Sequence, residues 1–487
     1  MVNYFVRKTG NDGLAGTSPA TAWATLGKAV GAAGISSGDK LYVGAGVYRE
    51  TPSFAMTSPT VDTQIIADVT GKFTGDPGYV VITKFTTDDL TIPSAGALIS
   101  PSGRGFITLD GFVLICFGVG IAGQTGGVST DWTIKNCVFI QHGTSASCIN
   151  FTGVVNTPLN LTVQNCRFWM MPSSTNRAVL ITLPTSTIVD YDANVRCENL
   201  AIYGCNSIIG LTANGSGANS FKGGGITVYG MTLHGGTTGI IANSTFSSTY
   251  PVKVYNSAFM GTATGLNANI LGQIIEDYNE FWCTTNRTNV DVGANSKNGR
   301  AMLVHIGQEV HAGFPLRSFL SPMKESPLLG FGNQAGGPLA DINGVPKPSG
   351  PALTWANSLP AVGAFEYANH AVKETGTVRT GANAIKLSGP GVQDFNIPVD
   401  AVSTTVTIYG QFNASYTGTK PQMKVLNGGE CGVADATATM TASSGTWEQI
   451  SLNFTPTAKG VVTIRLQNNT TDATGAGNAF FDDFAVT

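Results

Sequence analysis

The sequence has little charge, and what it has is nearly balanced. Charged residues make up 12% of the 487 residues, and 27 basic against 30 acidic side chains give a net charge of −3. This balance gives no general attraction to nucleic acid or to an anionic membrane, so we expect neither as a partner. The N-terminal residues contain no apolar stretch after a basic region, and we expect neither a signal peptide nor a transmembrane helix.

Motifs for metal, redox or nucleotide chemistry are also missing. The eight cysteines include no C-x-x-C pair and no Cys/His cluster, and the five histidines are scattered. We therefore expect buried free thiols rather than disulfides or zinc ligands. No P-loop, dinucleotide fingerprint or nucleophile elbow occurs in a credible context. The sequence predicts no cofactor, with one structural calcium site left open below.

What the chain has instead is a loose repeat of short strands that end in a small turn residue. The spacing of these turn residues is that of one supersecondary unit stacked repeatedly, as in a parallel β-solenoid. The residue after each turn is mostly apolar or a thiol, as expected for a buried column shared by neighbouring coils. The turn residues are Gly111, Asn136, Asn165, Gly204, Gly230 and Asn256, and the residues after them are Phe112, Cys137, Cys166, Cys205, Met231 and Ser257.

Both ends of the first 367 residues resemble a known superfamily. The opening YFVRKTGNDGLAGTSPATAWATLGKAV, followed by SSGDKLYVGAGVYRE, is similar to the start of right-handed parallel β-helix proteins of the pectate-lyase-like superfamily. Leu26, Ala29, Val30 and Ala33 have helical spacing and predict an N-terminal capping helix. The segments SPLL, DINGVPKP and VGAFEY, which end at Tyr367, resemble the closing part of such proteins. We predict a β-helix domain over residues 1–367.

Residues 368–487 have a different texture. Strict alternation of apolar residues, as in Ile450, Leu452 and Phe454, predicts half-buried antiparallel strands. The motifs RTG, GTW and FFDDF resemble jelly-roll carbohydrate-binding modules. The predicted fold class is therefore all-β: a right-handed parallel β-helix followed by a β-sandwich of the jelly-roll kind.

The sandwich offers candidate glycan and metal ligands. Tyr409, Phe412 and Tyr416 lie near turns and are candidates for stacking on sugar rings, whereas the resemblance implies that Trp447 packs in the core. Asp482 and Asp483 stand where resembling modules often hold a structural calcium. A solvated pair of acids is an equally good interpretation of these two residues.

Two acidic clusters are the candidates for catalysis in the β-helix. One lies in the longest repeat and the other at the last marked strand, where Trp282 beside acids has the composition of a sugar subsite. In the first, a solvated loop is the favoured interpretation. In the second, Glu276 and Glu280 share a face only if the strand between them stays regular. The candidates are Asp190, Asp192, Arg196, Glu198, Glu276 and Glu280.

The resemblance leaves activity open, because the superfamily includes lyases, hydrolases, phage tailspikes and non-catalytic adhesins. The scarcity of acids in the central repeats favours a non-catalytic phage virion-surface protein, a tail spike, capsid decoration or head fibre, that binds a cell-surface glycan. Such a protein is made in the host cytoplasm and contacts other virion proteins, and the resemblance implies that homotrimers are common. The alternative is a polysaccharide lyase or glycoside hydrolase of tailspike type.

Overall fold

The computed structural model describes two compact units, one before residue 300 and one after residue 371. It describes all residues except 86–95, 125–129, 144–146, 154–157, 171–175, 183–190, 205–207, 215–220, 244–250, 300–371, 375, 378, 381–383, 389–390, 400–402, 427–435, 456–459, 472–476 and 487. The predicted boundary at residue 367 lies outside the described residues and stays a prediction.

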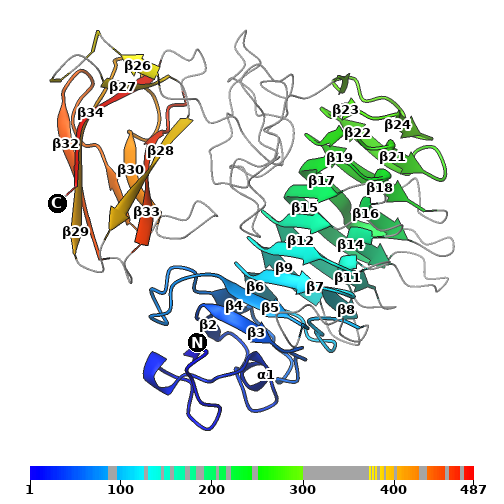
Figure 1. Cartoon of the computed structure of the whole chain (residues 1–487). Coiled ribbons are helices and arrows are strands. Elements are labelled where there is room, and N and C mark those ends of the chain that lie inside the picture. The colour runs from blue at the N-terminus through cyan, green and yellow to red at the C-terminus, as the bar shows by residue number, and fades with distance from the viewer. Residues whose placement is uncertain are drawn as a thin grey trace. The chain divides into compact units, whose positions relative to one another are not determined.

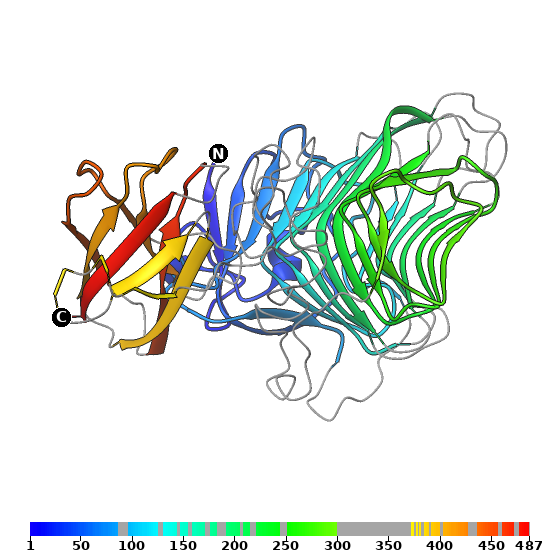
Figure 2. The same cartoon turned by 90° about the horizontal axis from the view of Figure 1, so that it is seen from above.

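The first unit is a parallel β-helix with three faces (Figure 1). An 18-stranded sheet forms two of them, which we call sheets I and II, and a 7-stranded sheet forms the third, sheet III. Strands β15 (Tyr191–Gly204) and β17 (Phe221–His234) run through both sheets I and II. Seen from the second direction, strands of successive coils lie one behind another (Figure 2).

The strands of each sheet follow the order of the coils. Sheet I continues with β1 (Asn3–Val6), β2 (Lys40–Val43), β4 (Thr63–Ala67), β6 (Ile107–Asp110), β9 (Thr130–Lys135), β12 (Leu159–Gln164), β19 (Val252–Tyr255) and β22 (Ile274–Asp277). Sheet II continues with β3 (Gly46–Arg49), β5 (Val80–Thr83), β7 (Val113–Cys116), β10 (Val138–Gln141), β13 (Arg167–Met170), β20 (Ala258–Met260), β23 (Glu280–Trp282) and β25 (Lys297–Asn298). Sheet III consists of β8 (Ile121–Gln124), β11 (Ser147–Thr152), β14 (Asn176–Thr182), β16 (Ile208–Asn214), β18 (Thr238–Ala242), β21 (Thr264–Ala268) and β24 (Thr285–Thr288).

Columns of apolar side chains fill the inside of the coils. Alternate residues of a strand point to opposite faces, so a residue in register with a core residue of the next coil also points inward. Each column is buried by the coils on both sides of it, which is why a single coil would not be stable alone. The inward column of sheet I contains Leu41, Ile65, Leu109, Ile134, Val163, Cys197, Val228 and Val254.

Residues with positive φ make the bend between sheets I and II. Five of the six turn residues predicted from the repeat have this conformation. The predicted turn at Gly204 is wrong: Gly204 ends β15, and Asn199, with φ 51°, makes the bend five residues earlier. Leu200 therefore takes the buried column position expected for Cys205, which itself lies outside the described residues. Asparagine suits this bend because it tolerates the left-handed region and its amide can bond to the next coil. The bends are Gly111, Asn136, Asn165, Asn199, Gly230, Asn256 and Tyr278.

The N-terminal end is closed by a shorter helix than the sequence predicts. Helix α1 (Leu26–Ala29) is a single turn, and Ala33 is exposed instead of lying on its buried face. A 3-10 turn, η1 (Pro19–Thr21), precedes it. The Glu50 carboxylate accepts the amides of Leu26 and Gly27 at 3.0 and 2.8 Å, which satisfies donors that a helix start leaves unpaired. No described helix has the length and hydropathy of a membrane span.

The second unit is an antiparallel β-sandwich. One sheet has the order β26 (Val372–Glu374), β27 (Ala384–Ser388), β34 (Asn478–Val486), β29 (Thr404–Phe412) and β32 (Glu448–Phe454). The other has the order β28 (Gly391–Val399), β33 (Gly460–Asn468), β30 (Gln422–Leu426) and β31 (Ala436–Thr439). Trp447, which the resemblance placed in the core, is only half-buried. The predicted fold class, a parallel β-helix followed by a β-sandwich, is confirmed.

Candidate functional site

The last described coil interrupts the apolar core with a polar network. Glu276 of β22 stands in register with Val254, and Arg287 of β24 stands in register with Leu266. Both therefore occupy positions that are apolar in the preceding coil. Their side chains are 0% and 8% exposed. The Glu276 carboxylate is thus an internal group and not part of the outer surface.

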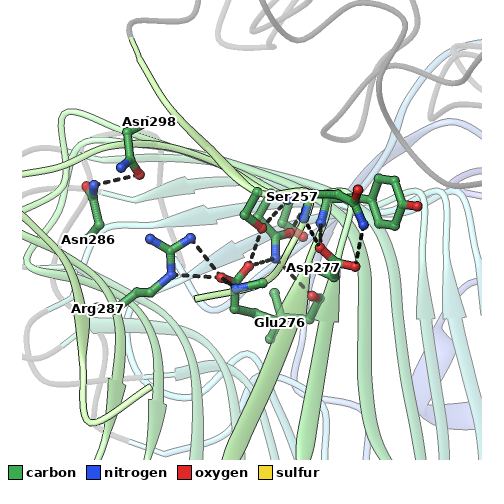
Figure 3. A network of polar contacts seen from close by, with 12 residues as sticks. Ser257, Glu276, Asp277, Asn286, Arg287 and Asn298 are labelled. Atoms are coloured by element: carbon green, nitrogen blue, oxygen red, sulfur yellow. Dashed lines mark hydrogen bonds and ion pairs between the residues drawn. The ribbon is translucent and has the colours of Figure 1, made fainter. Parts of the chain in front are cut away.

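The protein's own donors satisfy the Glu276 carboxylate (Figure 3). Its Oε1 lies 2.7 Å from Arg287 Nε and 2.7 Å from the amide of Gly293, and Nη2 of Arg287 is also 2.7 Å away. Its Oε2 accepts from Asn279 Nδ2 at 2.8 Å and from the Ser296 hydroxyl. The Arg287 guanidinium lies 4.1 Å from the centroid of the Phe281 ring. Glu276 and Arg287 form a buried ion pair in which both carboxylate oxygens accept hydrogen bonds, whereas Arg287 Nη2 makes no hydrogen bond with a described residue.

Glu276 and Glu280 do not share a face. Tyr278, with φ 57°, bends the chain between them, so Glu276 points inward from sheet I and Glu280 points outward from sheet II. Asp277, on the outer side of sheet I, accepts both the amide and the side chain of Asn295, at 2.7 and 2.9 Å.

Glu280 is the unusual acid of this coil. It is 1% exposed, its Oε2 is buried without a hydrogen-bond partner, and it stands in register with Lys297. Burial raises the pKa of the Glu280 carboxyl to about 7, against the opposing effect of Lys297. Trp282, two residues later on the same face, is 43% exposed.

The other acidic cluster is only partly described. Asp190 lies outside the described residues, and the side chain of Asp192 is not described, although its backbone lies in β15 opposite Lys222. Arg196 Nε donates to Glu198 Oε1 at 2.8 Å, and Gln164 donates to Oε2 at 3.0 Å. Arg196 and Glu198 therefore form an ion pair on the outer side of strand β15, in which the Arg196 side chain is 48% exposed and Glu198 is buried; the solvated loop favoured for this part of the cluster is wrong.

The three sandwich aromatics are engaged in the fold. Phe412 is 6% exposed and belongs to the core cluster. The Tyr416 hydroxyl donates to the carbonyl of Thr419 and accepts the amide of Asn469, and burial raises its pKa. The guanidinium of Arg379 lies 3.4 Å from the centroid of the Tyr409 ring and covers one of its faces.

Asp482 and Asp483 hold a neighbouring turn. Asp482 Oδ2 accepts the amides of Arg379 and Thr380 at 2.9 and 3.1 Å, and Asp483 receives the Arg379 guanidinium and the Thr380 hydroxyl. The hydrogen bonds from Thr380 and Arg379 lower the pKa of Asp483. No group of three or more His, Cys, Asp or Glu side chains in the described chain could hold a metal ion. These two carboxylates thus serve local donors, and they fit a calcium site poorly.

A column of side chains on the outer side of sheet II was not predicted from the sequence, although one of its members, Trp282, was a candidate sugar-binding residue. Its members stand in register from coil to coil and alternate with inward core residues. Each lies four positions after the bend of its own coil, and this constant offset is the signal that could have found them. The column contains Ile115, Ile140, Trp169, Tyr203, His234, Met260 and Trp282.

No family model matches the chain, and no curated protein matches it. Among solved structures, a family 16 carbohydrate-binding module is 17% identical, over 25% of this chain and 87% of its own, with a TM-score of 0.20. A pectate lyase is 12% identical, over 75% of this chain and 96% of its own, with a TM-score of 0.35. A tailspike protein of the Acinetobacter baumannii bacteriophage Fri1, described as a capsular polysaccharide depolymerase, is 13% identical over 93% of this chain and 72% of its own, with a TM-score of 0.29. The fold assignment rests on the strand register given above.

Proposed function

We propose that this chain is a non-catalytic, polysaccharide-binding protein of a phage virion surface. The β-helix is a stack of coils with long outer sheets, and a β-sandwich follows it in the sequence; outer sheets of this length are suited to bind a cell-surface glycan chain. Other virion proteins are the partners at the attached end, and a homotrimer is the expected assembly by the resemblance of the sequence.

The main support for a non-catalytic role is that most described candidate carboxylates are hydrogen-bonded to other groups of the protein. Cleavage of a glycosidic bond by the usual route needs two acids that face one substrate across about 5 to 9.5 Å. Glu276 is internal, Asp277 is held by Asn295, and Glu198 is held by Arg196 and Gln164. Among the described candidates, these groups are committed to the protein's own donors and are poorly placed to exchange protons with a sugar.

The test combines binding with product analysis. The full chain is incubated with purified bacterial capsular polysaccharides and O-antigen chains, and chain length and new reducing or unsaturated ends are followed by chromatography. We expect retention of at least one polymer at full length. Shortening of a polymer would refute the non-catalytic proposal, and lack of retention across the whole panel would refute polysaccharide binding. Immunogold labelling of particles tests the virion location separately.

One observation favours a depolymerase as the second candidate. With a pKa of about 7, the Glu280 carboxyl is protonated in part of the molecules at neutral pH, which is the state a general acid needs. If a polymer is shortened, Glu280→Gln should abolish the shortening, whereas Asp277→Asn, on the other side of the bend, should leave it largely intact. Equal activity of Glu280→Gln and the unaltered protein would exclude Glu280 as the acid.

A further inference from the structure

The outer column of sheet II is a continuous row that follows the axis of the β-helix. Ile140 pairs with Trp169, Trp169 with Tyr203, and Tyr203 with His234, each in the register of adjacent parallel strands. His234 then pairs with Met260, and Met260 with Trp282. With strands about 4.8 Å apart, the six positions from Ile140 to Trp282 extend over roughly 24 Å. A row of this length is long enough for several sugar units of one chain.

The rings of the row stack on one another. The Trp169 and Tyr203 ring centroids are 4.8 Å apart with planes tilted by 40°, and the Tyr203 and His234 centroids are 5.8 Å apart with planes at 13°. All three residues are half-buried. Ring faces in the middle of the row thus meet neighbouring rings. Tyr203 carries a hydroxyl and His234 carries ring nitrogens, groups of the kind that bond to sugar hydroxyls.

The far end of the row differs from its middle. Trp282 packs next to Met260, which is 1% exposed, on the side of the preceding coil. On the other side, β25 is followed by Gly299, whose amide donates to the carbonyl of Phe281 and which brings no side chain. Trp282 is 43% exposed, and an indole is an apolar ring of the kind on which a sugar ring packs.

The row itself contains no Asp, Glu, Lys or Arg, and exposed charge lies at its ends, at Lys297 and, two coils before Ile115 in the same column, at Arg49. A second outward column of sheet II, two positions earlier in each strand, runs beside the row. Its members Arg167 and Glu280 are 2% and 1% exposed, whereas Lys297, in register with Glu280 in the last described coil, is exposed. Val113 and Val138 of the same column form a buried apolar cluster with Ile115 and Ile140. Between these ends, the described surface therefore matches a chain with apolar ring faces and hydroxyls better than one that binds through its charges.

Resting on the proposed function, we infer that this row (Ile140, Trp169, Tyr203, His234, Met260 and Trp282) is the polysaccharide-binding track. The polymer lies along the β-helix axis, bonds to the Tyr203 hydroxyl and the His234 ring nitrogens, and packs one sugar ring on Trp282. Its class is a linear polysaccharide recognised through hydroxyls and ring faces. The β-helix, and not the sandwich aromatics, then carries most of the binding.

The experiment measures affinity of the full chain by affinity electrophoresis in gels that contain one purified capsular or O-antigen polysaccharide each, with alginate as a polyanionic reference. Trp282→Ala and Tyr203→Ala should each weaken binding of the retained polymer by about tenfold. Tyr203→Phe keeps the ring stack and tests the hydroxyl alone, with an expected loss of about threefold. Tyr255→Ala, which removes an aromatic ring from the outer side of sheet I, and Tyr409→Ala in the sandwich are matched controls and should bind normally.

The outcomes separate this inference from the proposed function. If the unaltered protein is retained, and Trp282→Ala and Tyr203→Phe with unchanged circular dichroism are retained equally well, the track is overturned while polysaccharide binding stands. If Tyr409→Ala alone loses binding, the sandwich is the site and the track is again overturned. If no gel retains the unaltered protein, the proposed function itself fails. Binding that falls steeply between about 50 and 300 mM salt would also overturn the uncharged mode of recognition.

Discussion

The buried pair Glu276 and Arg287 predicts an unequal response to two single substitutions. Glu276→Val restores the residue type found at Val254 in the previous coil, and Arg287→Leu restores that of Leu266. Judged by hydrophobicity alone, both changes extend the apolar core and should stabilise it. The hydrogen bonds around the pair predict the opposite result for each change alone.

Glu276→Val leaves the Arg287 cation buried without its partner and leaves the Gly293 amide and the Ser296 hydroxyl without their acceptor. Breaking a buried pair typically costs 3 to 5 kcal/mol, and we expect about 4 to 5 here. Arg287→Leu leaves the carboxylate with three remaining donors, from Gly293, Asn279 and Ser296, so we expect only about 2 to 3 kcal/mol. The double variant should cost less than the sum of the two by about 2 kcal/mol or more.

A chain with two units does not guarantee two-state unfolding, so the assay is native-state hydrogen exchange of the amides in β21 to β24. Each 1.4 kcal/mol corresponds to a tenfold faster exchange, so Glu276→Val should accelerate it by about a thousandfold and Arg287→Leu by about thirtyfold to a hundredfold. Arg196→Gln, in an ion pair whose arginine side chain is 48% exposed, is the control and should change exchange less than about fivefold. Equal effects of the two single substitutions, or additive effects in the double variant, would refute this reasoning.

Three further predictions follow from the same structure. Asn199, at φ 51°, donates from its side-chain amide to Asn165 at 3.0 Å. Asn199→Ala should therefore destabilise the protein by about 2 kcal/mol, and Asn199→Gly, which accepts the backbone conformation, by about 1 kcal/mol, as measured by thermal and denaturant midpoints. Equal losses in the two variants would contradict the role given to φ. The pKa of Glu280 in the folded protein, about 7, is above the ordinary value of 4.5, so the folded form binds the proton more tightly than the unfolded form. The stability that Glu280 contributes is therefore fully present below about pH 4.5 and is lost as the pH rises to about 7. In Glu280→Gln this loss should disappear from the pH dependence of hydrogen exchange in β23. Burial raises the pKa of the Cys116 and Cys197 thiols to about 12, so a thiol reagent at pH 8 should label these two at least a hundredfold more slowly in the native protein than after unfolding, as read by peptide mass spectrometry; rapid native labelling would show that the core opens.

Local patterns predicted the fold well because each coil repeats the same physical requirement. The bends at Asn136 and Asn165, and the buried residues after them, follow from positive φ and from burial between coils. The error at Gly204 has the same origin. Both Asn199 and Gly204 tolerate a bend, and strand β15 continues past Asn199, so spacing alone did not distinguish them. The side-chain ladder from Asn199 to Asn165, which does distinguish them, exists only once the coils are stacked.

The candidate site was predicted less well because a residue's role depended on which side of a strand it faced. Glu276 and Glu280 are acids of similar surroundings in the sequence, but the bend at Tyr278 turns one inward and one outward. A tyrosine with positive φ is uncommon, and nothing in the sequence around it marks it as a bend. For Phe412, proximity to a turn suggested exposure, whereas strict alternation in β29 places it in the core.

Once the bends are assigned, the outer row of sheet II follows from counting. Positions four residues after the bends at 136, 165, 199, 230, 256 and 278 are Ile140, Trp169, Tyr203, His234, Met260 and Trp282. With Gly204 taken as a bend, the count at that coil falls on Ile208 and breaks the row between Trp169 and His234. A single misplaced bend therefore hid a surface that crosses six coils. In a fold whose core is uniform from coil to coil, residues that bind a ligand have to lie at outward positions. Large aromatic side chains gathered at one outward position therefore argue for a binding surface rather than for added stability of the β-helix.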